Sequence, residues 1–216
     1  MSESDGTSFE TASVMAPRWK RCQSIALVHH LNEHCLELLA GVANVNSTIH
    51  VPLVSENREL WSRLSPVARR RAALMPFVIL DLHFTNERWW RRVIEAPSAA
   101  VCEPGSVDGL PPEQSARLMQ ETLMFAWQMA RSDQTAAQVS FGMRPAVAVM
   151  IGGLMPGQVR DIASWKSGSL RMRWQDDSRF WRELLLAVGA QDNEAIEELH
   201  LHAKLQLLGP LVYPHQ

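Results

Sequence analysis

The sequence predicts an all-α protein built from two helical units, and three observations support this. Apolar residues recur at three- and four-residue steps in the long segments 24–43 and 112–133. Helix-start signals are frequent, and the clearest is Ser65 followed by Pro66 at the first helical position. One stretch rich in proline, glycine and serine, residues 97–112, separates the two halves.

This division predicts four parts of the chain. The polar and acidic start, residues 1–16, lacks the basic and apolar segments of a signal peptide and is expected to be a disordered leader. Residues 17–96 are expected to form an N-terminal helical domain, to which the sequence assigns no role. Residues 97–112 are the predicted linker, and residues 113–216 are the predicted C-terminal helical domain.

In the N-terminal half, helix N-caps are expected at Ser24, at Ser65 and at Thr85 or Asn86. Residues 47–55 are expected to be a loop or an extended piece, because Pro52 opposes a helix. The apolar run 76–84 is compatible with a buried strand or with a buried helix. We predict a helix there, because no partner strand is evident.

The C-terminal half is predicted to contain a long helix followed by three short ones. The short helices are separated at Gly142, where we expect a positive φ, and the second and third are started by Pro145 and Pro156. Residues 169–175 alternate apolar and basic side chains and predict one short strand. Two final helices are expected, with boundaries at Gly189, Asp192 and Gly209.

Composition is that of a soluble globular protein, with 46% hydrophobic residues and a net charge of −2. Residues 131–182 hold eight basic and four acidic side chains, which permits phosphate contact without requiring it. The three cysteines form no CxxC pair, which indicates a reducing compartment without a disulfide framework. Together with the lack of a long apolar run, these features predict a cytoplasmic protein without a membrane span.

The histidines raise the possibility of a metal site. His30 and His34 are four residues apart on a predicted helix, with Cys35 beside them, and zinc accepts both residue types. No HExxH pattern is present, and a third ligand would have to come from a distant segment, so we favour ordinary histidines. No nucleophile elbow, phosphate loop or dinucleotide-binding pattern occurs either. We therefore expect a protein that is not an enzyme and that holds no cofactor.

Two further patterns indicate surfaces. Trp89 and Trp90 are adjacent on a predicted helix, so at least one is expected to lie at an edge or contact surface. The long helix of the C-terminal half offers an apolar dimer face, formed by Met124, Phe125 and Met129.

The three short helices have the rhythm of a DNA-reading helix-turn-helix, with Gly142 at the turn. The second helix, PAVAVMIGGL, carries no side chain that reads a base edge, so this segment is expected to be a scaffold. Contact with DNA phosphates or with a partner is expected instead from nearby basic residues: Arg144, Arg160, Lys166, Arg171 and Arg173.

Residues 113–208 resemble the flagellar transcriptional regulator FlhD family. The resemblance rests on AWQMARSDQTAAQVSFGM, AVAVMIGGLMPGQVRDIA and LRMRW, and it extends more weakly into the last helix. The matching positions are Ala126, Asp133, Ala137, Phe141, Gly142, Met143, Ala148, Ile151, Leu154, Gln158, Ile162, Ala163, Arg173 and Trp174. It implies an all-α, dimer-forming subunit of a transcription activator that works with a second subunit, FlhC, at promoter DNA.

Two departures from that family affect the expectation. Leu170 stands where members can carry a cysteine for an intersubunit disulfide, and residues 17–96 have no counterpart. We expect a homodimeric regulator subunit that acts with an FlhC-like or other protein partner, with or without double-stranded DNA. The alternative is a protein-interaction adaptor on the same helical fold that does not bind DNA.

Overall fold

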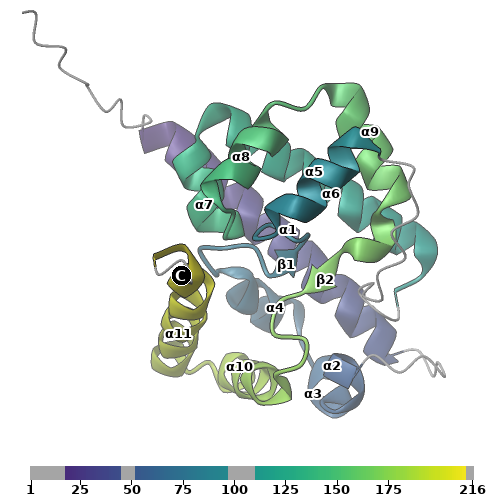
Figure 1. The fold of residues 1–216 in the computed structure, drawn as a ribbon. Helices are drawn as coiled ribbons and strands as arrows, with labels where there is room; N and C mark the ends of the chain where they lie inside the picture. Colours follow the sequence, from purple (N-terminus) through teal and green to yellow (C-terminus); the bar gives the residue numbers. More distant parts are fainter. Residues whose placement is uncertain (1–17, 45–51, 97–109, 213–216) are drawn as a thin grey trace, which may run out of the picture.

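The computed structural model describes residues 18–44, 52–96 and 110–212, and their fold confirms the all-α prediction (Figure 1). The predicted leader and most of the predicted linker lie outside these residues. In chain order the elements are α1 (Arg18–Asn44), α2 (Pro52–Ser55), α3 (Arg58–Ser62), α4 (Pro66–Ala73), β1 (Leu80–Asp81), α5 (Glu87–Glu95), α6 (Pro112–Ser132), α7 (Gln134–Phe141), α8 (Pro145–Gly152), α9 (Pro156–Trp165), the 3₁₀ turn η1 (Ser167–Ser169), β2 (Arg171–Met172), α10 (Ser178–Ala190) and α11 (Asn193–Val212).

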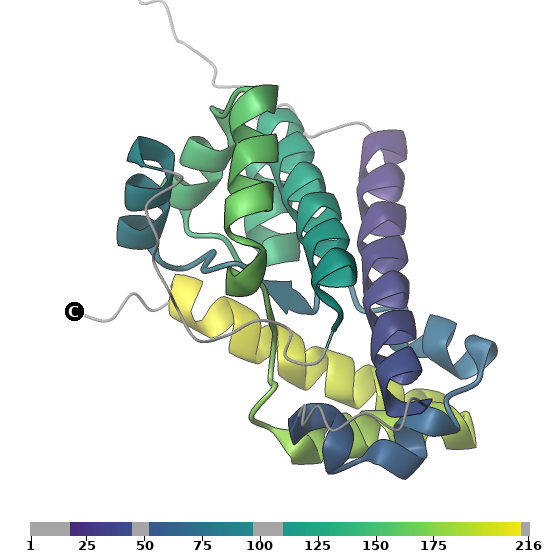
Figure 2. The ribbon, with the colours of Figure 1, turned by 90° about the vertical axis from the view of Figure 1, so that its right-hand side faces the viewer.

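The two predicted helical domains share one hydrophobic core, which corrects the division at residues 97–112. Helix α1 packs on α3 and α4 and also on α6, beside which it runs in Figure 2. Helix α10, from the far end of the chain, packs against α3 and α4. Trp61 and Trp181 are in ring contact across this interface, with centroids 5.8 Å apart. The N-terminal half therefore buries its apolar surface against the C-terminal half and has no separate core.

Most helix starts follow the predicted local chemistry. The side chains of Ser65 and Asn86 accept hydrogen bonds from the backbone N–H groups of Ala68 and Trp89. Asp133 caps α7, and Asp192 accepts from the N–H of Ala195 at the start of α11. The breaks at Gly142, Pro145 and Pro156 are confirmed.

Some boundaries differ from the prediction. Helix α1 begins before Ser24, and Pro52 starts the short helix α2, because proline suits the first helical turn. Helix α10 continues past Gly189 to Ala190, and Gln191 takes the left-handed conformation that ends it. Helix α11 continues past Gly209 to Val212. The glycine signals were therefore wrong at both places: each helix continues through its glycine, which a helix interior tolerates at a cost of about 1 kcal/mol.

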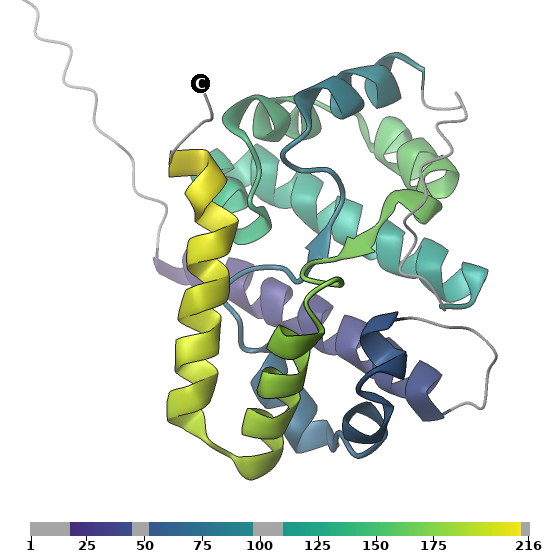
Figure 3. The ribbon, with the colours of Figure 1, turned by 60° about the horizontal axis from the view of Figure 1, so that its bottom comes forward.

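The apolar run 76–84 is not helical, so the predicted helix there was wrong: residues 80–81 form the strand β1, and most of the run around them is made of bends. Its strand β1 pairs with β2 in antiparallel register, Leu80 with Met172 and Asp81 with Arg171. Figure 3 shows this two-stranded pair near the centre of the molecule. The partner strand is the one predicted at 169–175. It comes about ninety residues later, too far for a local pattern to reveal the pairing.

Asn32 of α1 forms hydrogen bonds with backbone groups of this buried segment and of the end of α4. Its side-chain amide donates to the carbonyl of Phe77 at 2.9 Å and, more weakly, to that of Ala73 at 3.4 Å. Its side-chain oxygen accepts from the N–H of Ile79 at 3.0 Å. Asn32 is fully buried, so these bonds form where no water competes.

Arg173 forms hydrogen bonds with other backbone groups of the same segment. Its backbone N–H donates to the carbonyl of Ile79 at 2.8 Å, and its guanidinium donates to the carbonyls of Val78 at 3.0 Å and Phe141 at 2.6 Å. The carboxylate of Asp81 lies 3.3 Å from the same guanidinium. Burial lowers the pKa of Arg173, and the charge of Asp81 acts in the opposite direction. One side chain therefore joins the β1 segment to the end of α7.

The Arg173→Ala substitution should lower the free energy of unfolding by about 3 kcal/mol or more, because it leaves two buried carbonyls and a carboxylate without their donor. Arg160→Ala is the matched control, since Arg160 is exposed on α9 and should change stability by less than about 0.5 kcal/mol. Urea denaturation followed by circular dichroism measures both. Equal midpoints for the two variants would contradict the structural role of Arg173.

Gly142 has the expected left-handed conformation, with φ of 60°. A Cβ atom there would lie 2.4 Å from Cδ1 of Leu207 in α11. The Gly142→Ala variant should therefore unfold with a free energy lower by about 2 kcal/mol or more, from backbone strain and from the clash. Gly189→Ala is the control: it is helical, meets no atom within 4 Å, and should stabilise by about 0.5–1 kcal/mol. A melting temperature unchanged by Gly142→Ala would refute the argument.

Candidate functional site

The five basic residues predicted to contact DNA or a partner do not form one surface. Arg144 and Arg160 are exposed, and Arg171 is half-buried. Lys166 is buried, and Arg173 is engaged inside the fold as described above. The prediction is therefore corrected for Lys166, which is buried, and for Arg173, whose guanidinium is held by Asp81 and by backbone carbonyls.

The predicted dimer face on α6 is also largely internal. Met129 is buried in the core, while Met124 and Phe125 are half-buried and pack against it. Helix α6 packs against α1, α7, α8 and α9. The apolar side chains predicted to contact a second copy therefore contact these helices instead. Met129 is therefore corrected from a dimer contact to a core residue.

Trp89 and Trp90 are both buried, contrary to the expectation that one would reach a contact surface. Their rings meet edge to face with centroids 5.1 Å apart. Trp89 lies against His83, and Trp90 stacks on Phe84. The loop before α5 covers one flank of the helix while α8 and α9 cover the other, so neighbouring side chains are both enclosed.

The residues considered as metal ligands on α1 face different partners. Nδ1 of His34 lies 2.6 Å from a carboxylate oxygen of Glu121, and His30 is exposed. Cys35 is fully buried with its Sγ 3.3 Å from the sulfur of Met172, and burial raises the pKa of its thiol. Within the described ranges, no three His, Cys, Asp or Glu side chains gather as a metal site would require.

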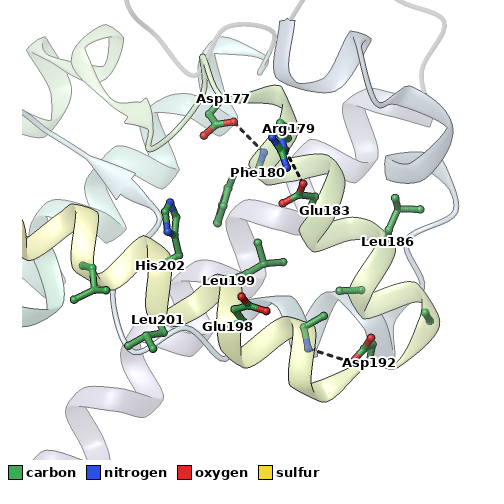
Figure 4. A pocket seen from close by; sticks show the side chains of 14 residues that line it. Asp177, Arg179, Phe180, Glu183, Leu186, Asp192, Glu198, Leu199, Leu201 and His202 are labelled. Atoms are coloured by element: carbon green, nitrogen blue, oxygen red, sulfur yellow. Dashed lines mark hydrogen bonds and ion pairs between the residues drawn. The ribbon is translucent and has the colours of Figure 1, made fainter.

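A groove with a volume of about 920 Å³ lies between α10 and α11 (Figure 4). The two helices form a hairpin across the tight turn at Gln191. Phe180 and Leu199 lie between them, as Figure 4 shows. In Figure 3 the hairpin lies along the side and the bottom of the molecule.

Large apolar side chains line this groove and remain open to solvent. Leu186 of α10 is 48% exposed, and Leu201 and Leu205 of α11 are 59% and 64% exposed. Leu201 and Leu205 are four residues apart, so they share one face of the helix. Three exposed leucines therefore lie around one groove.

The polar residues of the groove are predominantly acidic. Four carboxylates line it, those of Asp177, Glu183, Asp192 and Glu198, against one arginine, Arg179. Arg179 is paired with Glu183 at 2.7 Å. With the histidine neutral, the lining carries a net charge of −3, larger than the −2 of the whole chain. The groove is therefore apolar and negatively charged.

The sequence of α11 contains more apolar residues than one helix face can hold, and this feature could have indicated the exposed leucines of the groove. Helix α11 has apolar residues on more than one face: Ile196, Ala203 and Leu207 are buried, while Leu201 and Leu205 are not. When a helix has apolar residues on two faces and only one face packs on the core, the apolar residues of the other face remain exposed. Which leucines point outward depends on how α11 packs on the rest of the fold.

Comparison of the chain with family models, with curated proteins and with solved structures finds no match. No helix of the described residues is long and apolar enough to cross a membrane.

Two histidines meet where α11 packs near α1. Burial, and then the nearby charge of His29, lower the pKa of His200 from an ordinary value near 6.5 to about 4. Burial also lowers the pKa of His29. The folded protein therefore favours neutral histidines at this contact.

Stability should decrease as the pH falls from about 6.5 towards 4. In that range the unfolded state binds a proton at His200 that the folded state does not accept. His200→Gln removes this titration and should flatten the decline, as measured by urea midpoints across the pH range. His202→Gln, an exposed histidine on the same helix, should keep the decline of the native protein. An identical pH dependence for His200→Gln and the native protein would contradict this assignment.

Proposed function

We propose that the chain is a non-enzymatic subunit of a transcription regulator, related in type to the FlhD family, that acts by binding a protein partner in the α10/α11 groove. The observation that carries the proposal is the groove itself, with three solvent-exposed leucines and a net charge of −3. The resemblance of residues 113–208 to the FlhD family supports the regulatory role.

The groove suits an amphipathic helix with basic flanks. Such helices place apolar side chains at i, i+3, i+4 and i+7 into an apolar groove between two helices. Leu186, Leu201 and Leu205 would contact that apolar stripe, and a lysine or arginine beside it would meet Glu198. Burying the leucines supplies affinity, and the carboxylates select against acidic partners.

Two observations favour a different protein over a second copy of this chain at the groove. Two copies meeting groove to groove would bring two surfaces of net charge −3 together, which is unfavourable. The apolar residues predicted to form a dimer face are buried or packed against the core. A basic partner protein would fit the charge of the groove better than a second copy of this chain.

The polar groups of the groove support binding rather than catalysis. Asp177 and Asp192 accept backbone N–H bonds at the starts of α10 and α11. Arg179 and Glu183 neutralise one another. These side chains therefore have structural partners, and the adaptor without DNA binding remains the second candidate because it would use the same groove.

A basic model peptide tests the binding surface. The probe is a labelled helical peptide of leucine and lysine with leucines at i, i+3, i+4 and i+7, and fluorescence anisotropy measures its dissociation constant. Leu201→Ser combined with Leu205→Ser should weaken binding at least tenfold, because two exposed leucines lose their contact area. Leu74→Ser is the control, since Leu74 is 54% exposed outside the groove.

The same peptide with glutamate in place of lysine should bind far more weakly to the native protein. Equal affinity for the two peptides, or binding that does not depend on Leu201 and Leu205, would refute the groove assignment. The regulatory role is tested separately by transcript profiles. Cells whose native gene carries the double leucine variant should reproduce the changes caused by deleting the gene, and cells with Leu74→Ser should not.

A further inference from the structure

A second cavity lies where α10 packs against α3 and α4. Its volume is about 470 Å³, within the range of about 300–1,000 Å³ that is typical of small-molecule sites. Leu64, Leu185 and Val188 are buried in its walls, and Val67 is exposed at its edge. The described residues that line it include no aromatic ring and no carboxylate. The cavity is therefore aliphatic, apart from the arginines considered next.

Helix α4 carries three consecutive arginines, and only the third lines this cavity. Arg69 and Arg70 form ion pairs with Glu37 and Glu33 of α1. Successive residues of an α-helix are rotated by about 100° from one another, so the third side chain leaves that face. Arg71 lies in the lining of the cavity between α4 and α10.

Arg71 brings a positive charge that no neighbouring carboxylate balances. Its Nη1 is buried, and no described group accepts a hydrogen bond from that atom. An enclosed donor of a charged group is costly to leave without an acceptor. The other arginine of the lining, Arg63, is 75% exposed and is paired with Glu59 at 2.7 Å. The cavity therefore lacks one negative charge, beside Arg71.

The lining selects the kind of anion. A carboxylate has one charge and two oxygens, which a single guanidinium matches with paired hydrogen bonds. A phosphate group, with a charge of about −1.5 to −2, would keep an unbalanced charge against apolar walls. Leucine and valine side chains suit an aliphatic chain, and no ring is present on which an aromatic ligand could stack.

We infer that this cavity binds an aliphatic monocarboxylate, with its carboxylate on Arg71 and its chain against Leu64, Leu185 and Val188. The site goes beyond the proposed partner-binding function, because Arg71 and the walls from α3 and α4 take no part in the groove. Leu186 and Ala190 line both the cavity and the groove. The bound carboxylate would therefore lie against the same helix, α10, that forms one wall of the groove.

Titration of the full chain with octanoate tests the site. With ¹³C-labelled leucine and valine methyl groups, the NMR signals of Leu64, Leu185 and Val188 should shift and saturate, while those of Leu201 and Leu205 in the groove should not. Calorimetry measures the dissociation constant. Affinity should rise about threefold for each methylene added between butyrate and octanoate, because the chain is buried in the cavity.

Variants of Arg71 test the carboxylate contact. Arg71→Gln should weaken octanoate binding by about tenfold or more, because the charged hydrogen bonds are lost. Arg71→Lys should have an intermediate affinity, since it keeps the charge without the paired geometry. Arg182→Gln is the matched control: Arg182 is an exposed arginine of α10 outside the lining, and this variant should keep the native affinity.

A neutral analogue provides a test on the native protein alone. 1-Octanol has the same chain without the charge and should bind about tenfold or more weakly than octanoate. Thermal melting checks that each Arg71 variant is folded, and the octanol comparison decides the question even where a variant is not.

The inference is overturned if octanoate does not bind the native protein at millimolar concentration, or if folded Arg71→Gln keeps the native affinity. It is also overturned if 1-octanol binds as tightly as octanoate, or if inorganic phosphate binds and octanoate does not. The variant with Leu201→Ser and Leu205→Ser should bind octanoate with native affinity, and Arg71→Gln should bind the leucine–lysine peptide with native affinity. A failure at this cavity is therefore distinguishable from a failure of the groove.

Discussion

Phe77, Val78 and Ile79 pass through the hydrophobic core just before β1, and a peptide group there without a hydrogen bond costs about 1–3 kcal/mol. The two-residue ladder with β2 is too short to satisfy them. Asn32 from α1 and Arg173 after β2 supply the missing donors and acceptor, and the carbonyl of Ser140 accepts from the N–H of Val78 at 2.8 Å. Helix α1, the end of α7 and the residue after β2 are therefore tied to one buried segment, although they lie far apart in the chain.

The turn at Gly142 belongs to the same arrangement. The carbonyl of Phe141, at the end of α7, accepts from Arg173, and the next residue takes the left-handed conformation against Leu207 of α11. A turn that resembles the centre of a DNA-reading motif is thus closed off by a guanidinium and by the last helix. The three short helices serve as a scaffold, and the surfaces free for partners lie at their edges and on α10 and α11.

The free charges of the molecule are separated between two such surfaces. The groove of α10 and α11 is apolar and acidic, whereas the depression at the starts of α5 and α8 is polar and basic. The two surfaces therefore differ in the sign of their charge and in their apolar content.

Local chemistry in the sequence determined the helices and several of their starts. Ser65, Asn86 and Asp133 cap helices through bonds to residues three positions later, and Gly142 turns because glycine alone tolerates its φ without strain. Those interactions lie within a few residues, so a pattern can reveal them. The ends of α10 and α11 were misplaced, because each helix continues past the glycine that was expected to end it.

Only the tertiary structure decided which polar and apolar side chains are exposed to solvent. Lys166 and Arg173 have the same sequence character as Arg144, yet they are buried or engaged while Arg144 is exposed. Met129 entered the core, and Leu201 and Leu205 stayed outside it. The physical reason is that the burial of a residue depends on which distant segments pack over it. The pairing of residues 80–81 with 171–172 and the packing of α10 on α3 and α4 are contacts of this kind. A repeat of apolar residues within one short segment cannot predict them.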